Sequence, residues 1–242
     1  MEKLETNITS GPIIELDNVK RVFHVGEVEV EALRGVNAEI NAGEYVVLLG
    51  PSGSGKTTLL NQIGGIDQPT EGTVKISHVD ITHFDEEEMT KLRRKTIGWI
   101  FQFHNLIPSL SSMENVQLAL ELMEDKENQV ERSIQALEDV GLGEYVDRFP
   151  AQLSGGQQQR VAIARALVKQ PTIIVADEPT GNLDKETGNV IVDLMLDLCH
   201  SKGITFVVVT HDPSMAKVAD RVLSMEDGKI VDSNVLSKTI KE

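Results

Sequence analysis

Short apolar runs and helix-like segments alternate along most of the chain. Nearly continuous apolar runs, which are typical of buried strands, occur at residues 45–49, 97–101, 172–176 and 205–210. Segments with apolar residues at helical spacing or with helix-end signals lie between these runs. Buried strands that alternate with helices predict a mostly parallel sheet that is covered on both faces.

The chain before the first buried run has a different pattern. Residues 13–25 read as a strand, and residues 28–40 alternate apolar and polar positions well enough for a second one. We expect these two segments to form an antiparallel sheet edge ahead of the phosphate loop, as an N-terminal antiparallel β subdomain. Further short strands are predicted at 73–76, 221–225 and 229–231.

The stretch from 103 to 168 contains helix patterns and no buried strand pattern. Apolar residues recur at helical spacing at 114–123 and 128–140, and the second pattern stops at a Gly-Leu-Gly sequence. A third helix is predicted after Ser154, whose side chain is suited to cap it. We interpret this stretch as an inserted α-helical subdomain.

The composition fits one globular domain. The chain has 242 residues, of which 40% are hydrophobic and 25% are charged, so it can bury a substantial core. We expect a single domain over residues 1–242, with a core from 12–102 and 169–235 and the helical subdomain at 103–168. No apolar stretch is as long as a membrane span, and the first residues lack the features of a signal peptide. A cytoplasmic location is therefore expected.

The formal net charge of −15 excludes some classes of partner. It opposes contact with a phosphate backbone, so nucleic acid is not an expected partner. It also opposes direct adhesion to anionic lipid, so any membrane attachment is expected to run through a protein. The basic run at 91–95 is interpreted as a solvated helix end. The single cysteine, Cys199, lies in an apolar-periodic run, which favours burial over reactivity.

A phosphate-loop motif follows the first buried run and precedes a helix pattern. It has the form G-x-x-x-x-G-K-[ST], and its residues are Gly50, Pro51, Ser52, Gly53, Ser54, Gly55, Lys56, Thr57 and Thr58. Its glycines let the backbone wrap a phosphate, its amides point at anionic oxygens, and Lys56 adds a positive charge. Thr57 offers a hydroxyl to Mg²⁺. A glycine turn with an incidental lysine fits this complete pattern poorly, so we expect a nucleoside triphosphate and an α/β phosphate-loop NTPase core.

Other candidate site residues end the predicted strands. Asp177 and Glu178 follow one buried run, and two carboxylates at such a position are costly unless a cation or a reaction uses them. Mg²⁺ on a bound nucleotide would use them. Gln102 and His211 end two other strands, at the sheet edge where open α/β sheets bind ligands. The free amides after Ser154 form a second candidate anion site.

Taken in order, these motifs resemble those of the nucleotide-binding subunit of an ATP-binding cassette transporter. The likeness covers roughly residues 13–231 and includes Gln102, LSGGQ at 153–157, Leu183-Asp184 and His211. LSGGQ is its most specific part, because other phosphate-loop ATPases lack this sequence. Finer likeness to the lipoprotein-releasing, macrolide-export and cell-division branch lies in GPSGSGKTTLLNQIGGID, NLIPSLSSMENV, LSGGQQQRVAIARAL and ADEPTGNLD.

The resemblance implies a head-to-tail dimer, formed with a second copy or with a similar subunit. In such a dimer ATP lies between the phosphate loop of one subunit and the signature residues of the other, which are Ser154, Gly155, Gly156 and Gln157. The chain departs from the usual family pattern at two positions. Thr57 replaces a serine and keeps its hydroxyl. Phe23 replaces a tyrosine and keeps a ring that could stack on adenine; without the resemblance, Phe23 could equally belong to the core.

The resemblance also implies roles for the remaining site residues. Lys56 would hold β/γ oxygens, and the ligands of Mg²⁺ would be Thr57, Gln102 and Asp177. Glu178 would be the general base that orients the attacking water, and the alternative is a salt-bridged carboxylate. His211 would contact the γ-phosphate, although a histidine at a strand end is often structural. Asp184 would communicate across the dimer.

For a transporter, the output would be movement of a membrane permease. Leu106, Ile107 and Leu110 are apolar in a loop-like setting and are predicted to help receive a short helix of that permease, with packing inside the helical subdomain as the alternative. A soluble assembly scaffold and a force-transmitting division complex without cargo remain alternatives. A DNA-repair or chromosome-structuring ATPase is not favoured, because residues 56–154 leave no room for its long coiled coil.

Overall fold

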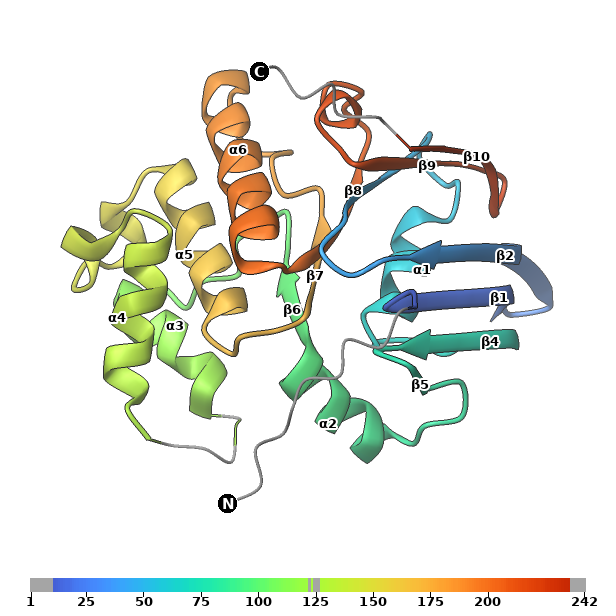
Figure 1. Ribbon diagram of the computed structural model, residues 1–242, viewed down its shortest axis with the longest axis horizontal. Helices are drawn as coiled ribbons and strands as arrows, with labels where there is room; N and C mark the ends of the chain where they lie inside the picture. Colours follow the sequence, from blue (N-terminus) through green and yellow to red (C-terminus); the bar gives the residue numbers. More distant parts are fainter. Residues whose placement is uncertain (1–10, 122, 124–126, 236–242) are drawn as a thin grey trace.

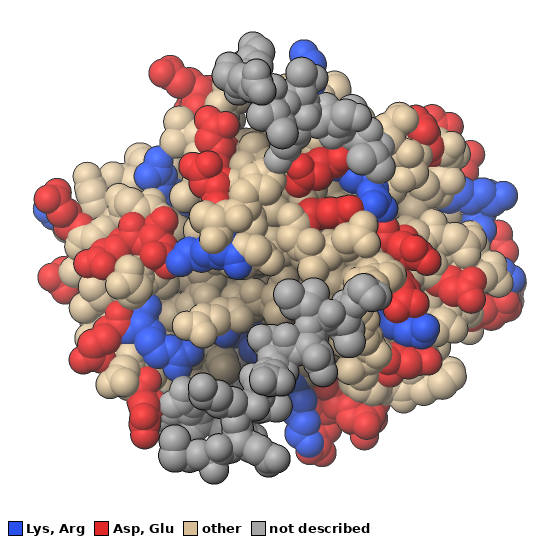
Figure 2. All heavy atoms as spheres, in the orientation of Figure 1, with Lys and Arg blue, Asp and Glu red and all other residues tan. Residues whose placement is uncertain are grey.

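The computed structural model describes residues 11–121, 123 and 127–235 of the chain. Figure 1 shows an antiparallel sheet at one end, a larger sheet in the middle and a group of helices at the other end. None of the described helices is long and apolar enough to cross a membrane. Figure 2 shows acidic side chains spread over the visible face, as the formal net charge of −15 suggests.

The larger sheet has six strands and is mostly parallel, as predicted. In spatial order, its strands are β10 (Lys229–Val235), β9 (Arg221–Glu226), β3 (Tyr45–Leu49), β8 (Thr205–Thr210), β7 (Ile173–Asp177) and β6 (Ile97–Ile100). Every neighbouring pair is parallel except β10 and β9, which are antiparallel. The carboxyl ends of β3, β6, β7 and β8 therefore meet at one edge of the sheet.

The pleat of these strands divides the core into two clusters. Tyr45 and Val47 of β3 belong to the cluster on the side of helices α5 (Gly155–Leu167) and α6 (Lys185–Lys202). Val46 and Leu48 belong to the cluster on the side of helix α1 (Lys56–Ile63) and the antiparallel sheet. Successive side chains of a strand point to opposite faces, and here both faces are covered. This is why these strands appear in the sequence as continuous apolar runs.

The predicted N-terminal antiparallel β subdomain is confirmed, and it forms a sheet separate from the six-stranded one. Its four strands, in spatial order, are β2 (Val28–Ile40), β1 (Ile14–Val25), β4 (Glu71–Ile76) and β5 (Val79–Asp80). Its buried residues, which include Ile14 and Val36, pack in the second core cluster. The apolar residues of β1 and β2 are thus used for face-to-face packing on the core. The Arg34 amide donates to the Gly228 carbonyl oxygen at 2.9 Å and ties the two sheets together.

The helices lie close to their predicted positions. Helix α2 (Glu86–Thr96) starts with a capping box between Asp85 and Glu88 and flanks the core. The helical lobe contains α3 (Ser112–Glu121), α4 (Gln129–Asp139) and α5. The expected end of the first lobe helix, at residue 123, lies next to a residue outside the described ones. Short 3₁₀ turns occur at Gly143–Tyr145, Pro150–Gln152 and Met215–Lys217.

Candidate nucleotide site

Glycines shape the loop that links β3 to α1. A Cβ at position 50 would come within 2.2 Å of the Met225 carbonyl oxygen, so only glycine fits there. Gly53 and Gly55 have φ angles of 80° and 99°, in the region that favours glycine. Gly55 precedes α1 directly and provides no side-chain cap. The first N–H groups of this helix therefore remain available to an anion.

Lys56 is the first residue of α1 and is only 8% exposed. Its ammonium donates to the carbonyl oxygens of Gly50 and Pro51, both at 2.8 Å. Burial lowers the pKa of Lys56, while the charges of Glu178 and Asp177 act in the opposite direction. A lysine ammonium has three donors, so one remains for an anionic oxygen. A phosphate group here would restore part of the solvation that burial removes.

Asp177 lies at the carboxyl end of β7, beside the start of α1. Burial is the main cause of its raised pKa, and the adjacent Glu178 raises the pKa further. Lys56 and a side-chain hydrogen bond from Thr57 oppose this shift. A carboxylate and a hydroxyl in contact offer oxygen ligands of the kind that Mg²⁺ prefers. These two side chains therefore fit a magnesium ion, whose charge would offset the cost of burying the carboxylate.

Glu178 is held by two neighbours at the end of β8. His211 Nδ1 lies 2.8 Å from one carboxylate oxygen, and the Thr210 hydroxyl donates to the other at 3.2 Å. The Glu178 side chain is 18% exposed, whereas that of His211 is 73% exposed. The Glu178 backbone has a φ of 47°, which is uncommon for a glutamate. The carboxylate is thus oriented by its neighbours. Thr210 is not recognisable as a site residue in the sequence, because a threonine that ends a strand carries no distinctive signal.

A cavity of about 390 Å³ brings most of these residues together. It is lined by Val30, Glu31, Ala32, Ser52, Gly53, Gly55, Lys56, Thr57, Thr58, Asp177, Glu178, Val209 and His211. The sequence does not predict that Val30, Glu31 and Ala32 of β2 line this cavity. The alternation of apolar and polar residues in a strand does not tell which distant loop the strand contacts. Contact explains it, because a Cβ at Gly55 would lie 2.6 Å from the Ala32 carbonyl oxygen.

Several predicted site residues are not part of this lining, namely Phe23, Gly50, Pro51, Ser54, Gln102, Asp184 and the signature residues. Gln102 Nε2 donates to Asn182 Oδ1 at 3.4 Å, and Asn182 Nδ2 donates to the Gln102 carbonyl oxygen at 3.1 Å. Phe23 is 36% exposed, has the Arg21 guanidinium 4.6 Å from its ring centre, and pairs in register with the cavity residue Val30. Metal ligation by Gln102 and base stacking by Phe23 therefore stay predictions.

Three of the four signature residues, Ser154, Gly156 and Gln157, line a different cavity, of about 460 Å³. Ser154 caps α5 as predicted: its hydroxyl oxygen accepts from the Gln157 N–H at 3.3 Å, and the Ser154 N–H donates to the Gln157 side chain at 2.9 Å. A Cβ at Gly156 would come within 2.5 Å of the Thr187 side chain, so α5 and α6 start in close contact. Asp184 accepts from the Thr187 N–H at 3.0 Å and caps α6. Among the described residues, none lines both this cavity and the phosphate-loop cavity.

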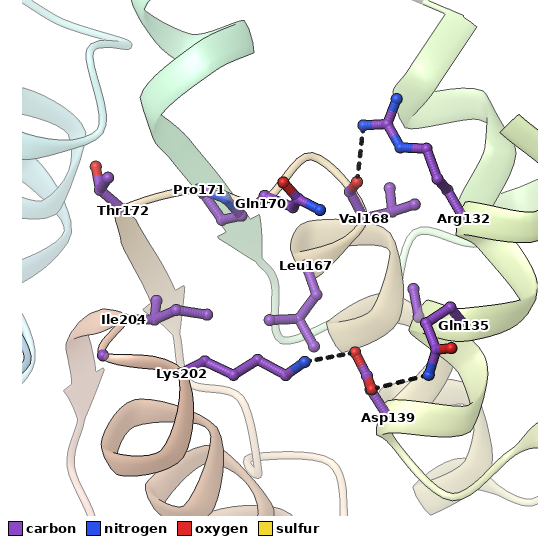
Figure 3. A pocket seen from close by; sticks show the side chains of 12 residues that line it. Arg132, Gln135, Asp139, Leu167, Val168, Gln170, Pro171, Thr172, Lys202 and Ile204 are labelled. Carbon is purple, nitrogen blue, oxygen red and sulfur yellow. Dashed lines mark hydrogen bonds and ion pairs between the residues drawn. The ribbon is translucent and has the colours of Figure 1, made fainter. Parts of the chain in front are cut away.

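A third cavity, of about 590 Å³, contains none of the predicted site residues. It lies where the helical lobe meets the core, and Figure 3 shows its charged side chains directed toward partners. Lys202 of α6 pairs with Asp139 of α4 at 2.7 Å, and Arg132 donates to the Val168 carbonyl oxygen at 3.3 Å. These contacts join the lobe to the core, so this cavity is a seam between two parts of the fold.

Comparison with known proteins places this geometry in a family. A family model described as "ABC transporter" matches residues 33–181. The chain is 46% identical over 220 residues to the lipoprotein-releasing system ATP-binding protein LolD of Syntrophus aciditrophicus, which covers 90% of this chain and 99% of that protein. It is 42% identical over 221 residues to the macrolide export ATP-binding/permease protein MacB of Syntrophobacter fumaroxidans, which covers 90% of this chain and 31% of that longer protein.

A solved structure agrees with the sequence comparisons. The dimer of an ATP-binding cassette in a post-hydrolysis state, bound to ADP and Pi, superimposes with a TM-score of 0.83 at 44% identity, over 92% of this chain and 98% of that one. The predicted phosphate-loop α/β fold is confirmed by this likeness. The chain belongs to the ABC transporter family, in which it is an ATP-hydrolysing nucleotide-binding subunit.

Proposed function

We propose that two copies of this chain, or one copy and a similar subunit, close head to tail on ATP and drive a membrane permease that exports or extracts a hydrophobic substrate. The observation that carries this proposal is the separation of the two anion sites. The phosphate loop and the signature helix line different cavities of the same chain. A second subunit can bring its own signature helix to the phosphate loop, which one chain by itself does not do.

The residues of the phosphate-loop cavity divide the work of phosphoryl transfer, which depends on positioning and charge neutralisation. Lys56 and the loop amides bind the β- and γ-phosphates. Glu178 accepts the proton of the attacking water, and His211 and Thr210 hold its carboxylate in place. The partner's Ser154 offers its hydroxyl hydrogen to the γ-phosphate, because its oxygen is already engaged by the Gln157 N–H.

Magnesium would be held by the Thr57 hydroxyl and the Asp177 carboxylate, with Gln102 as the third protein ligand. The ion supplies charge neutralisation on the β- and γ-phosphate oxygens. Asp177 and Lys56 are both partly desolvated, with their pKa values displaced toward the neutral forms. A bound nucleotide with its metal would favour the charged forms of Lys56 and Asp177. These charged forms would in turn attract the phosphates and the metal ion.

The movement of the helical lobe would carry the signal out of the site. Gln102 begins a loop that is fastened to the lobe at two places. Arg165 of α5 donates to the carbonyl oxygens of His104 and Asn105, at 2.8 and 2.6 Å. The buried Asn115 of α3 exchanges hydrogen bonds with the backbone of Ile107. A shift of Gln102 at the γ-phosphate would therefore pull on both α3 and the signature helix α5.

The permease would contact this same loop. Phe103 and Ile107 are 69% and 37% exposed, which suits an apolar contact with a short helix of the permease. Leu106 is partly buried and packs against the lobe core, so packing explains part of its apolar character. The chain itself would then lie at the cytoplasmic face of the membrane, attached through the permease. Nucleic acid is not a proposed partner, in keeping with the net charge of −15.

Purification of a tagged Glu178→Gln variant from detergent-solubilised host membranes, with ATP and Mg²⁺, tests the transport proposal. A protein with several membrane spans should copurify, and its domain outside the membrane would narrow the substrate class. A second variant, Ile107→Glu, should lose that protein while the isolated subunit still hydrolyses ATP. Recovery of soluble proteins alone would instead favour an assembly scaffold. A membrane partner without measurable cargo movement would favour force transmission.

A further inference from the structure

Three side chains of different ligand type gather at the edge of the six-stranded sheet opposite the phosphate loop. Cys199 and His200 belong to the last turn of α6, and Asp220 directly precedes β9. The phosphate loop follows β3, and β9 runs parallel to β3, so the start of β9 lies at the other end of these strands. This cluster is therefore separate from the nucleotide site.

We propose that Cys199, His200 and Asp220 bind one thiophilic divalent cation, for which Zn²⁺ is the best fit. The thiol sulfur, an imidazole nitrogen and a carboxylate oxygen all lie within 4.8 Å of one another. A tetrahedral zinc site, with bonds of roughly 2.0–2.3 Å, holds such atoms about 3.3–3.6 Å apart. His200 Nε2 and Asp220 Oδ2 are already 3.3 Å apart. The sulfur would have to approach the other two atoms by about 1.5 Å at most.

The surroundings of the cluster suit a cation. The last turn of α6 is the negative end of a helix dipole, which stabilises positive charge. Two neighbouring cations are already neutralised: Arg221 pairs with Glu44 at 2.9 Å, and Lys202 pairs with Asp139 at 2.7 Å. Because both positive side chains are paired with carboxylates, they would repel a bound divalent ion less.

Outer contacts already orient the proposed ligands. The Tyr45 N–H donates to Asp220 Oδ2 at 2.9 Å, which fixes the carboxylate as metal sites commonly require. The Cys199 thiol donates to the Gly43 carbonyl oxygen at 3.3 Å, which holds the sulfur at the side of the cluster. His200 is exposed, whereas the Cys199 thiol is buried. Imidazole and thiolate ligands favour Zn²⁺, whereas the oxygen ligands at the phosphate loop favour Mg²⁺.

A zinc titration of the tag-free, metal-stripped chain tests the site. The chain is held in saturating Mg²⁺ without nucleotide, and a chromophoric zinc chelator competes for the metal. We expect one Zn²⁺ per chain, with release of a proton as the thiol becomes a thiolate. Cobalt substituted for zinc should give a thiolate-to-metal charge-transfer band, which reports directly on Cys199.

Matched variants separate this site from adventitious binding. Cys199→Ser, His200→Gln and Asp220→Asn should each weaken zinc binding at least about tenfold, the smallest loss expected when even an outer contact of a metal site is removed. His83→Gln is the control, because His83 is an exposed histidine outside the proposed cluster. Asparagine at 220 keeps an acceptor for the Tyr45 N–H, so this variant should keep its melting temperature. The absence of stoichiometric binding, the absence of the thiolate band, or undiminished binding by Cys199→Ser would overturn the proposal.

Discussion

The starts of α1 and α5 are both helix ends that can receive an anion, but they are built differently. The start of α1 follows Gly55 in a left-handed conformation, has no side-chain cap there, and faces Lys56, Asp177 and Glu178. The start of α5 is closed by the capping box of Ser154 and Gln157. The start of α1 therefore presents charged groups that suit a reaction, whereas the start of α5 is a capped helix end that supplies N–H donors. In the proposed head-to-tail dimer these helix starts would be two complementary halves of one site, which predicts how each responds to mutation.

The largest expected effect belongs to the carboxylate of the first half. Glu178→Gln should slow ATP hydrolysis by about 10²–10⁴-fold, because it removes a general base but keeps the side-chain volume. Binding of ATP should persist, and the variant should accumulate as a dimer in size-exclusion chromatography with ATP. Phosphate release by the purified subunit measures the rate, and Glu131→Gln on the exposed face of α4 is the control. Wild-type turnover in the Glu178→Gln variant would remove Glu178 as the base.

A change at the start of α5 should abolish most ATP hydrolysis without unfolding the protein. Ser154→Asp keeps a good N-cap residue, so the melting temperature should hold, but it places a negative charge where a partner's triphosphate would lie. We expect a loss of hydrolysis of about 10²-fold, as for removal of one electrostatic donor, with nucleotide binding to the single chain unchanged. A fluorescent nucleotide titration and a phosphate-release assay separate these two readouts.

Mixing the two defects sharpens this test. In a head-to-tail dimer of Lys56→Ala with Ser154→Asp, one composite site is intact and the other carries both changes. If sites act independently, an equimolar mixture should recover about a quarter of the wild-type rate, since half of the dimers are mixed and each has one intact site of two. A mixture no more active than the mean of its parents would contradict a head-to-tail arrangement.

A smaller effect concerns the stability of the first half without nucleotide. The folded-state pKa of Asp177 is raised, so its ionised form destabilises the fold at neutral pH, and this cost disappears as the pH falls through the raised pKa. Asp177→Asn should therefore raise the melting temperature near pH 7, by about 2 °C, because the carboxylate is only partly buried. The difference between variant and wild type should shrink at acidic pH. Calorimetry across a pH series measures it.

The smallest effect concerns the seam that joins the helical lobe to the core. Lys202 and Asp139 form an ion pair between core and lobe, with side chains 42% and 24% exposed. A double-mutant cycle with Lys202→Met and Asp139→Asn should give a coupling free energy of ~0.2–1 kcal/mol, since partly solvated pairs contribute little. Urea denaturation measures it. A coupling above that range would show that the seam is more rigid than its exposure suggests.

Some parts of the fold and of the site are easier to predict from the sequence than others. Apolar runs identify the parallel strands well, because burial on both faces leaves no other pattern, and the phosphate loop and Ser154 carry motifs with a local mechanism. The position of β2 over the loop depends on a contact between Gly55 and Ala32, which are distant in sequence. The role of Gln102 as a metal ligand and that of Phe23 as an adenine stacker rest on resemblance alone, since neither residue lines the cavity in this structure.

The left-handed backbone of Glu178 has a further consequence for directed evolution. At a φ of 47°, a glutamate carries strain on the order of 1–3 kcal/mol, which glycine would relieve. A library screened only for survival after heating would therefore enrich replacements at position 178, and the survivors would be inactive enzymes. A screen that also demands ATP turnover should keep the glutamate. The residue found at position 178 would therefore show whether variants were selected for heat resistance alone or also for activity.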